Sequence, residues 1–208
     1  MSPAPASVIA LDEAQVSAAI AVLVPAFLGD PIFNYYFPDR DIRRKVFELF
    51  FNDVIRGQIP AKGAFAVTDG ATLSGVAVWM PPDPPEPTAI DRERGERTVE
   101  QLRALDGRGA DAVLAGFEGL QAHHPDEPHW YLMFVGVNPQ VQRRGLGRLL
   151  LTQVHQQADR TGTPCYLETP FPETRAFYGS LGYYVIREMR AFGDAPPLWT
   201  MLRKPNSS

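Results

Sequence analysis

Cysteine is nearly absent from the sequence: Cys165 is the only one among 208 residues, so no disulfide can form within the chain. This scarcity is typical of proteins in a reducing compartment, and we expect a cytoplasmic protein. Long apolar runs are missing too, because the longest, Ala18–Leu28, is too short to span a bilayer and contains Pro25. The N-terminus has neither a basic residue nor an apolar core, so we expect residues 1–6 to be a loose tail and not a signal peptide.

Neither sign of charge dominates, since the net charge is −4 and 21% of the residues are charged. The slight acidity argues against a nucleic-acid partner, and the length predicts one globular domain, residues 1–208. Metal-binding motifs are absent as well. His123, His124 and His129 fit no metal-ligand spacing, so we expect solvated or capping histidines and no metal.

The segment Tyr131–Arg148, YLMFVGVNPQVQRRGLGR, combines a strand, a glycine-containing loop and a helix. Leu132–Val137 has the length and composition of a strand, and Asn138-Pro139 ends it because proline cannot donate to a strand ladder. The helix is predicted from one apolar face, which contains Gly147, Leu150, Leu151, Val154 and Ala158. The opposite, polar face contains Arg148, Thr152, His155 and Asp159.

A strand, loop and helix in this order suit a bound phosphate. The first turn of a helix has backbone N–H groups without partners and lies at the positive end of the helix dipole. Glycine lets the backbone approach a bulky anion closely. Arg143, Arg144 and Arg148 add positive charge here to an otherwise acidic chain. We therefore predict a site for a polyanionic, phosphate-bearing ligand.

Two other phosphate-binding loops fit this stretch poorly. A dinucleotide-binding loop has a third glycine where Leu150 stands and begins directly after the strand, whereas residues 138–144 separate this strand from Gly145. A P-loop needs a lysine, and this stretch has none.

The rest of the chain predicts further strands and helices around this unit. Strands are expected at 8–11, 64–68, 72–80, 165–169, 183–190 and 198–202, with Asp69-Gly70 in a hairpin turn. Helices are expected from Asp12 to about Phe27, from Asp39 onward, and over 172–182. Residues 81–128 form a proline-rich connector with two helices, 91–105 and 110–122, an insertion long enough to cover something.

Two motifs match a known superfamily. Gln142–Gly147, QRRGLG, matches Q/R-x-x-G-x-G/A, and Phe177–Tyr183, FYGSLGY, matches a tyrosine followed by a glycine–aromatic pair. With this order of elements, the chain resembles the GCN5-related N-acetyltransferase (GNAT) superfamily. EPHWYLMFVGVNPQVQRRGLG, the run Leu167–Thr169 and the C-terminal W-x-M-x-R-K-P are similar to its puromycin N-acetyltransferase branch.

The resemblance implies an α/β (α+β) fold: a mixed central sheet of six to seven strands flanked by helices, with the helical insertion between the third and fourth strands. It also implies acetyl-CoA as co-substrate, whose pantetheine arm binds the central strand and whose pyrophosphate binds the loop. The implied cofactor-binding residues are Val135, Gly136, Val137, Gln142, Arg143, Arg144, Gly145, Leu146, Gly147, Arg148, Thr174 and Phe177.

The resemblance gives Tyr178 the position of the proton donor to the CoA thiolate, and Glu168, at the end of its strand, is the candidate base. Cys165 and Ser180 lack a visible base partner, which argues against a covalent acyl-enzyme. The segment 32–37 corresponds to the loop between the first two helices, which lines the acceptor site in this superfamily, although core packing explains its aromatics equally well. The implied acceptor contacts are Tyr35, Tyr36, Trp79 and Tyr131.

We therefore expect an acetyl-CoA-dependent N-acetyltransferase that acts by direct transfer on an amine of a small molecule, such as an antibiotic or an aminonucleoside-like compound. The insertion indicates a closed pocket, which suits a small acceptor. A non-catalytic acyl-CoA sensor and a protein or peptide N-acetyltransferase remain alternatives. The protein would act as a monomer or homodimer, without nucleic acid or membrane.

Overall fold

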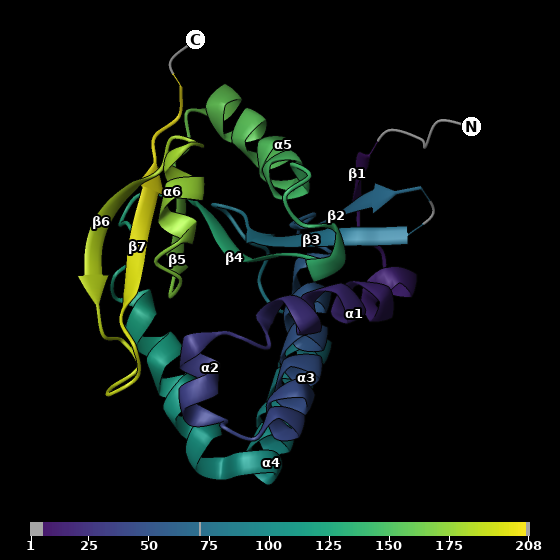
Figure 1. Cartoon of the computed structure of the whole chain (residues 1–208), viewed down its shortest axis with the longest axis vertical. Helices are drawn as coiled ribbons and strands as arrows, with labels where there is room; N and C mark the ends of the chain where they lie inside the picture. Colours follow the sequence, from purple (N-terminus) through teal and green to yellow (C-terminus); the bar gives the residue numbers. More distant parts are fainter. Residues whose placement is uncertain (1–5, 71, 207–208) are drawn as a thin grey trace.

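The computed structural model describes residues 6–70 and 72–206 (Figure 1), so the expected tail lies outside the described residues apart from Ala6. The described strands form a 7-stranded sheet in the order β1-β2-β3-β4-β5-β7-β6. Its strands are β1 (Ser7–Ala10), β2 (Ala64–Asp69), β3 (Thr72–Met80), β4 (Trp130–Val137), β5 (Cys165–Thr169), β6 (Tyr184–Met189) and β7 (Leu198–Arg203). The pair β4–β5 is parallel and its neighbours are antiparallel, so the predicted mixed sheet is confirmed.

Helices cover both faces of the sheet. They are α1 (Val16–Phe27), α2 (Pro31–Tyr36), α3 (Arg40–Gln58), α4 (Ala89–Gln121), α5 (Leu146–Thr161) and α6 (Thr174–Gly179). Helices α1 and α3 pack against one face, which includes Val76 and Val78, and α2 and α4 pack on α3. Helix α5 packs against the other face, which includes Ala77 and Trp79 (Figure 1). The alternation of side chains along β3 thus divides the core in two. Among the described residues, no helix has the length and apolar character needed to cross a bilayer.

The predicted start of the first helical segment is confirmed in detail. Gln15 N donates to Asp12 Oδ1 and Asp12 N donates to Gln15 Oε1, both at 3.0 Å. This reciprocal capping box satisfies two backbone donors that the helix itself cannot. It opens a short 3-10 turn, Glu13–Gln15, that leads directly into α1.

Residues 32–37, expected as a loop, are largely helical. Asp30 Oδ1 accepts the N–H groups of Ile32 and Phe33, and Pro31 occupies the first position of α2. An aspartate cap followed by proline favours a helix start, because both satisfy or remove the donors that lack intrahelical partners. The sequence signal was present but short, and the aromatic composition of the segment obscured it.

The insertion between β3 and β4 is confirmed, and its two predicted helices join in one kinked helix, α4. Asp106, with φ −159° and ψ 96°, interrupts the helical geometry. Its Oδ1 accepts the N–H of Gly109 at 2.9 Å and so caps the second half. That half packs on α3, where the rings of Phe117 and Phe50 stack with centroids 5.4 Å apart. The insertion is therefore part of the hydrophobic core.

Strands β4 and β5 separate after a short pairing. The parallel ladder covers three residue pairs and ends at Leu132 and Leu167. Beyond it β5 continues beside β7 to Thr169, while β4 continues beside β3 to Val137. A shift in the β3–β4 register leaves Met133 as an extra residue, a bulge that increases the local twist. A wedge therefore opens between two neighbouring strands of the sheet.

His155 does not follow the prediction of a polar face on α5, because it is buried. Its Nε2 atom lies 2.9 Å from the hydroxyl of Tyr183, and its ring meets that of Trp79 edge-on. Burial lowers its pKa to about 4, so the ring is neutral. Periodicity failed here because the chain that returns after α6 covers a second side of α5, which no local pattern indicates.

Replacing Gly63 by alanine should destabilise the protein, because a Cβ there would lie 2.0 Å from the backbone oxygen of Trp79. The N–H of Trp79 donates to Gly63 O at 2.8 Å, so relief requires moving paired backbone. We expect the free energy of unfolding to fall by about 1–3 kcal/mol, measured by urea denaturation with circular dichroism. Gly29→Ala is the control, since a Cβ there meets nothing within 4 Å. Equal stability of the two variants would contradict this account.

Candidate functional site

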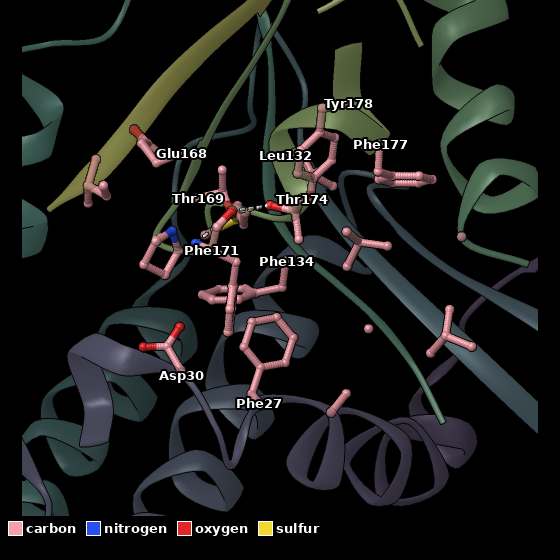
Figure 2. A pocket seen from close by; sticks show the side chains of 18 of the residues that line it. Phe27, Asp30, Leu132, Phe134, Glu168, Thr169, Phe171, Thr174, Phe177 and Tyr178 are labelled. Carbon is pink, nitrogen blue, oxygen red and sulfur yellow. Dashed lines mark hydrogen bonds between the residues drawn. The ribbon is translucent and has the colours of Figure 1, made fainter. Parts of the chain in front are cut away.

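A cavity of about 670 Å³ occupies the wedge between β4 and β5 (Figure 2). One side is formed by the ends of α1 and α4, the turn before α2, and α2 itself. The other side is formed by β4, the loop after it, the start of α5, the end of β5, and α6. The cavity thus joins the predicted phosphate loop and the predicted catalytic residues in one space.

The edge of β4 that faces the cavity has backbone groups without a strand partner. Asn138 N donates to Ser74 O at 2.9 Å, and hydrogen-bonding direction alternates along an antiparallel pair. The N–H and C=O groups of Val135 and Val137 therefore point away from β3, to the side that β5 has left. Gln142 Nε2 donates to Val137 O at 3.1 Å. The N–H of both valines and the C=O of Val135 can accordingly bind a ligand.

The loop after β4 presents a row of free donors. Gly145, the N-cap of α5, has φ +83°, a conformation that glycine adopts without strain. Arg143 also has a positive φ, +65°, which is uncommon for a residue with a side chain. Within the described chain, the backbone N–H groups from Arg144 to Arg148 donate to no backbone oxygen. The turn thus directs several amides at one place beside the positive end of α5.

Gly147 leaves room for a ligand, whereas Gly136 leaves room for a helix. A Cβ on Gly147 would point between Phe177 Cζ, 3.5 Å away, and Val137 Cγ2, 3.9 Å away, without a clash inside the protein. A Cβ on Gly136 would lie 2.8 Å from Leu23 Cδ2, so glycine is needed there for the packing of α1 on β4. Both residues line the cavity for different physical reasons.

The three loop arginines have different positions. Arg143 and Arg148 line the cavity, and Arg148 also ties α5 to α6 through a 2.7 Å hydrogen bond from Nη2 to Ser180 Oγ. Arg144 instead forms an ion pair with Asp69 of the β2–β3 hairpin, at 2.8 Å, and does not line the cavity. Eleven of the twelve predicted cofactor residues therefore lie at the cavity, with Arg144 as the exception.

Tyr178 of α6 is buried and lines the cavity. Burial raises the pKa of its phenol well above the ordinary value, and no charge or hydrogen bond from the described residues offsets this effect. The phenol is thus protonated at neutral pH and can donate. Thr174, one turn earlier, is held by Thr169, with the two hydroxyl oxygens 2.8 Å apart, and this contact fixes the turn between β5 and α6.

Glu168 lies among aromatic and histidine side chains at the end of β5. His124 Nε2 is 3.3 Å from Glu168 Oε1, and the ring centroids of Tyr131 and Tyr166 lie 4.5 and 4.7 Å from that of His124. No described residue donates a well-aligned hydrogen bond to Glu168 Oε1. Burial first, and then the Glu168 carboxylate, raise the pKa of Tyr131 well above its usual range. One carboxylate oxygen is thus buried close to a histidine and accepts no well-aligned hydrogen bond from the described residues.

The prediction of solvated or capping histidines is wrong for His124 and His129. Both are partly buried, and His129 Nε2 lies 3.3 Å from His124 Nδ1. Burial lowers the pKa of His129, because a charged ring would lose hydration. The third histidine, His123, is exposed. The sequence could not reveal these contacts, because they join the end of the insertion to a strand more than forty residues later.

Asp30 is a second buried carboxylate on the cavity wall, with 5% of its surface exposed. Its Oδ1 atom accepts the N–H of Ile32 at 2.9 Å and the N–H of Phe33 at 3.0 Å. Burial raises its pKa to about 6, although the two hydrogen bonds act in the opposite direction. In the sequence it was visible only as a helix-ending turn residue.

The predicted acceptor contacts are mostly misplaced. Trp79 is completely buried under α5, on the other face of the sheet, and cannot touch a ligand in this cavity. Tyr35 is 50% exposed and lies outside the cavity, and Tyr36, also outside it, donates its hydroxyl to the backbone oxygen of Phe192. Only Tyr131 of the four lines the cavity. The apolar wall is formed instead by Phe33, which lies in the aromatic segment expected at the acceptor site, and by residues that were not among the predicted contacts, Phe27, Phe117, Phe134, Phe171 and Phe192.

A backbone edge, an anion-binding helix start and a protonated phenol around one cavity define a site that can bind a phosphate-bearing thioester and a second reactant. The model of the acetyltransferase (GNAT) family matches residues 60–183. This match covers more than half of the chain, which therefore belongs to the acetyltransferase (GNAT) family. Enzymes of this family use acetyl-CoA and an amine.

Curated relatives agree with this assignment. An uncharacterized N-acetyltransferase of Schizosaccharomyces pombe is 27% identical over 207 residues, covering 91% of this chain and 79% of the relative. The mycothiol acetyltransferase of Gordonia bronchialis is 31% identical over 109 residues, covering 49% of this chain and 35% of the relative.

Solved structures share the fold. A Corynebacterium glutamicum protein, described as histone acetyltransferase HPA2 and related acetyltransferase, superposes with a TM-score of 0.69 at 24% identity, covering 100% of this chain and 99% of the other. The polyamine N-acetyltransferase of Drosophila melanogaster gives a TM-score of 0.65 at 15% identity, covering 96% and 100%. An agmatine N-acetyltransferase gives 0.68 at 14% identity, covering 96% and 99%.

Gly147→Val should abolish measurable acetyl-CoA binding without unfolding the protein. The side chain would fill the space between Phe177 and Val137 from which a pyrophosphate must reach the loop amides. Isothermal titration calorimetry with acetyl-CoA measures the effect. Gly179→Val in α6 is the matched control, because a Cβ there meets nothing within 4 Å and the residue does not line the cavity. Wild-type affinity in a folded Gly147→Val protein would refute a phosphate site at this loop.

Proposed function

We propose that this protein transfers the acetyl group of acetyl-CoA directly to an amine of a small molecule. The observation that supports this most is the convergence of the free β4 edge, the amide-rich loop, Tyr178 and Glu168 on one cavity. A steady release of CoA thiol that depends on an added amine tests the activity. Tight acetyl-CoA binding without thiol release in the presence of any amine would favour a non-catalytic sensor instead. We also propose a single domain, residues 1–208.

The cavity residues fit acetyl-CoA, which supplies an acetyl group activated as a thioester. The amides from Arg144 to Arg148 would hold the pyrophosphate, with Arg143 and Arg148 adding charge at the cavity wall. The backbone groups of Val135 and Val137 would pair with the pantetheine arm in the place of a neighbouring strand. An N–H of this edge is also suited to stabilise negative charge on the acetyl oxygen.

Glu168 would take a proton from the incoming amine, directly or through a water molecule. Only the neutral amine has a lone pair for the attack, and a lysine-like amine has a pKa near about 10.4, so a base is needed most for basic acceptors. His124, whose Nε2 atom is 3.3 Å from Glu168 Oε1, would position the carboxylate. Tyr178 would give its proton to the departing thiolate, a role that its buried and protonated phenol supports.

Direct transfer is supported by the state of the two potential nucleophiles. Cys165 is buried in the core under α5, away from the cavity, and burial raises its thiol pKa to about 12. Ser180 Oγ donates to the backbone oxygen of Phe177 at 2.7 Å and accepts from Arg148. Among the residues that the structure describes, no base forms a hydrogen bond with either group.

A small acceptor is supported by the wall that α4 adds. Phe117 and Leu120 of the insertion line the cavity opposite β4, which favours an enclosed space over the open groove that a protein acceptor needs. Two structural neighbours are a polyamine and an agmatine N-acetyltransferase, so small amines suit this fold. The similarity to the puromycin N-acetyltransferase branch stays a prediction, as does the cytoplasmic location.

Replacing Tyr178 by phenylalanine should lower kcat by about 10- to 1000-fold, because the proton donor is lost while the ring packing stays. The KM for acetyl-CoA should change little, since the interaction is made in the transition state. Steady-state kinetics measures both. Tyr184→Phe on exposed β6 is the control. Wild-type kcat under conditions where chemistry limits the rate would rule out the acid role.

Glu168→Gln should reduce kcat most for strongly basic acceptors and least for weakly basic ones, because the latter lose their proton to solvent. The measurement compares kcat for two acceptors of similar shape and different amine pKa. Glu118→Gln, on the exposed part of α4, is the control. An equal loss for both acceptors would argue for a structural role of Glu168 and against its role as base.

A further inference from the structure

Asp30 is a buried carboxylate without a cation beside it. Its two hydrogen bonds both go to Oδ1, and within the described chain no donor reaches Oδ2 and no lysine, arginine or histidine pairs with the side chain. Buried aspartates are rare unless they are paired, because the charge loses its hydration. Asp30 is therefore a buried carboxylate whose charge no cationic side chain of the described residues compensates.

Its role as a helix cap does not explain a charged residue at this place. Asparagine caps a helix as well as aspartate does, and its burial costs less. Asp39 shows the same cap at α3, with Oδ1 accepting from Asp41 N at 2.8 Å and Ile42 N at 3.0 Å. Asp39 is exposed, so water hydrates its charge, whereas Asp30 can be compensated only from the cavity that it lines.

Figure 2 shows the carboxylate of Asp30 at one end of the cavity, across from Tyr178, with Phe134 and Phe171 between them. A group bound at Asp30 is therefore not the amine that receives the acetyl group. The intervening wall is aromatic and aliphatic, which suits an apolar segment.

The least exposed charged groups of the cavity also favour a cation at this end. Arg143 and Arg148 lie at the phosphate loop, and the exposed Glu173 also lines the cavity. The buried Asp30 and Glu168, whose side chain is 7% exposed, lie on the acceptor side. Phe33, directly beyond the cap, and Phe117, with ring centroids 6.4 Å apart, line the same end of the cavity without adding positive charge. The acceptor side thus favours positive charge.

We infer that the acceptor carries, besides the amine that is acetylated, a second cationic group, an ammonium or guanidinium, which Asp30 binds across an apolar segment. This inference rests on the proposed function, because it names the substrate class of the same site. It assigns Asp30 as a specificity-determining residue, with no part in the proton transfers.

The experiment uses the full chain and straight-chain diamines of increasing length. Each diamine is paired with the alkylamine in which a methyl group replaces the second ammonium. We expect kcat/KM to favour the diamine in wild type at one or two lengths. Asp30→Asn, which keeps the cap, should lower kcat/KM for those diamines by about 10- to 100-fold through KM. It should leave the alkylamines and the KM for acetyl-CoA nearly unchanged. Asp39→Asn is the matched control and should change neither the kcat/KM for the diamines nor that for the alkylamines.

Two results would overturn the inference while leaving the proposed function intact. One is equal acetylation of diamines and alkylamines by wild type, and the other is an equal effect of Asp30→Asn on both. If no amine supports thiol release, the proposed function fails, and calorimetry then decides about Asp30 separately. Binding of the diamines to the acetyl-CoA complex of wild type, lost in Asp30→Asn, supports the cation site, and absence of binding to wild type refutes it.

Discussion

The separation of β4 from β5 is the constraint on which the site depends. Had the parallel ladder continued past Leu132, strand pairing would have satisfied the backbone groups of Val135 and Val137. Because the pairing stops, both N–H groups and the C=O of Val135 face a wedge in which water or a ligand must complete their hydrogen bonds, while Gln142 binds the C=O of Val137. A ligand with amide groups along an extended arm can take the place of the missing strand segment. The fold therefore builds its binding edge by omitting a part of its own sheet.

The same wedge brings together elements from all parts of the chain. The loop and α5 add free amides and arginines at one end, and α2, α4 and the turn at Asp30 close the other. Anion-binding groups and carboxylates are thus held apart by an aromatic wall. In the proposed function, this separation would let one cavity hold a phosphate-bearing co-substrate and a cationic acceptor without direct competition between their charges.

Sequence reasoning predicted the cofactor side far better than the acceptor side. The strand, loop and first turn of α5 are contiguous, and their chemistry depends on backbone groups that local patterns indicate. The acceptor side is assembled from distant segments. The alternation of side chains along β3 places Trp79 on one of the two faces of the sheet. Only the packing of α5 on that face shows that Trp79 lies away from the cavity. The contact between His124 and Glu168 also joins segments that are far apart in the sequence, so no local pattern predicts it.

By itself the sequence determined the order of most elements, the helix start at Asp12, the hairpin at Asp69-Gly70, the helical insertion and the glycine-containing loop before α5, because each depends on residues close together in the chain. The tertiary structure alone decided that Asp30 lies on the cavity wall, that His155 is buried, and which aromatics line the cavity. Which residues are buried, and which residues they contact, depends on which surfaces pack together. The hydrophobic periodicity and the turn residues of the sequence do not determine that packing. From the sequence alone, Asp30 is an ordinary turn residue. Only the folded structure buries its carboxylate and leaves its charge without a compensating partner among the described residues.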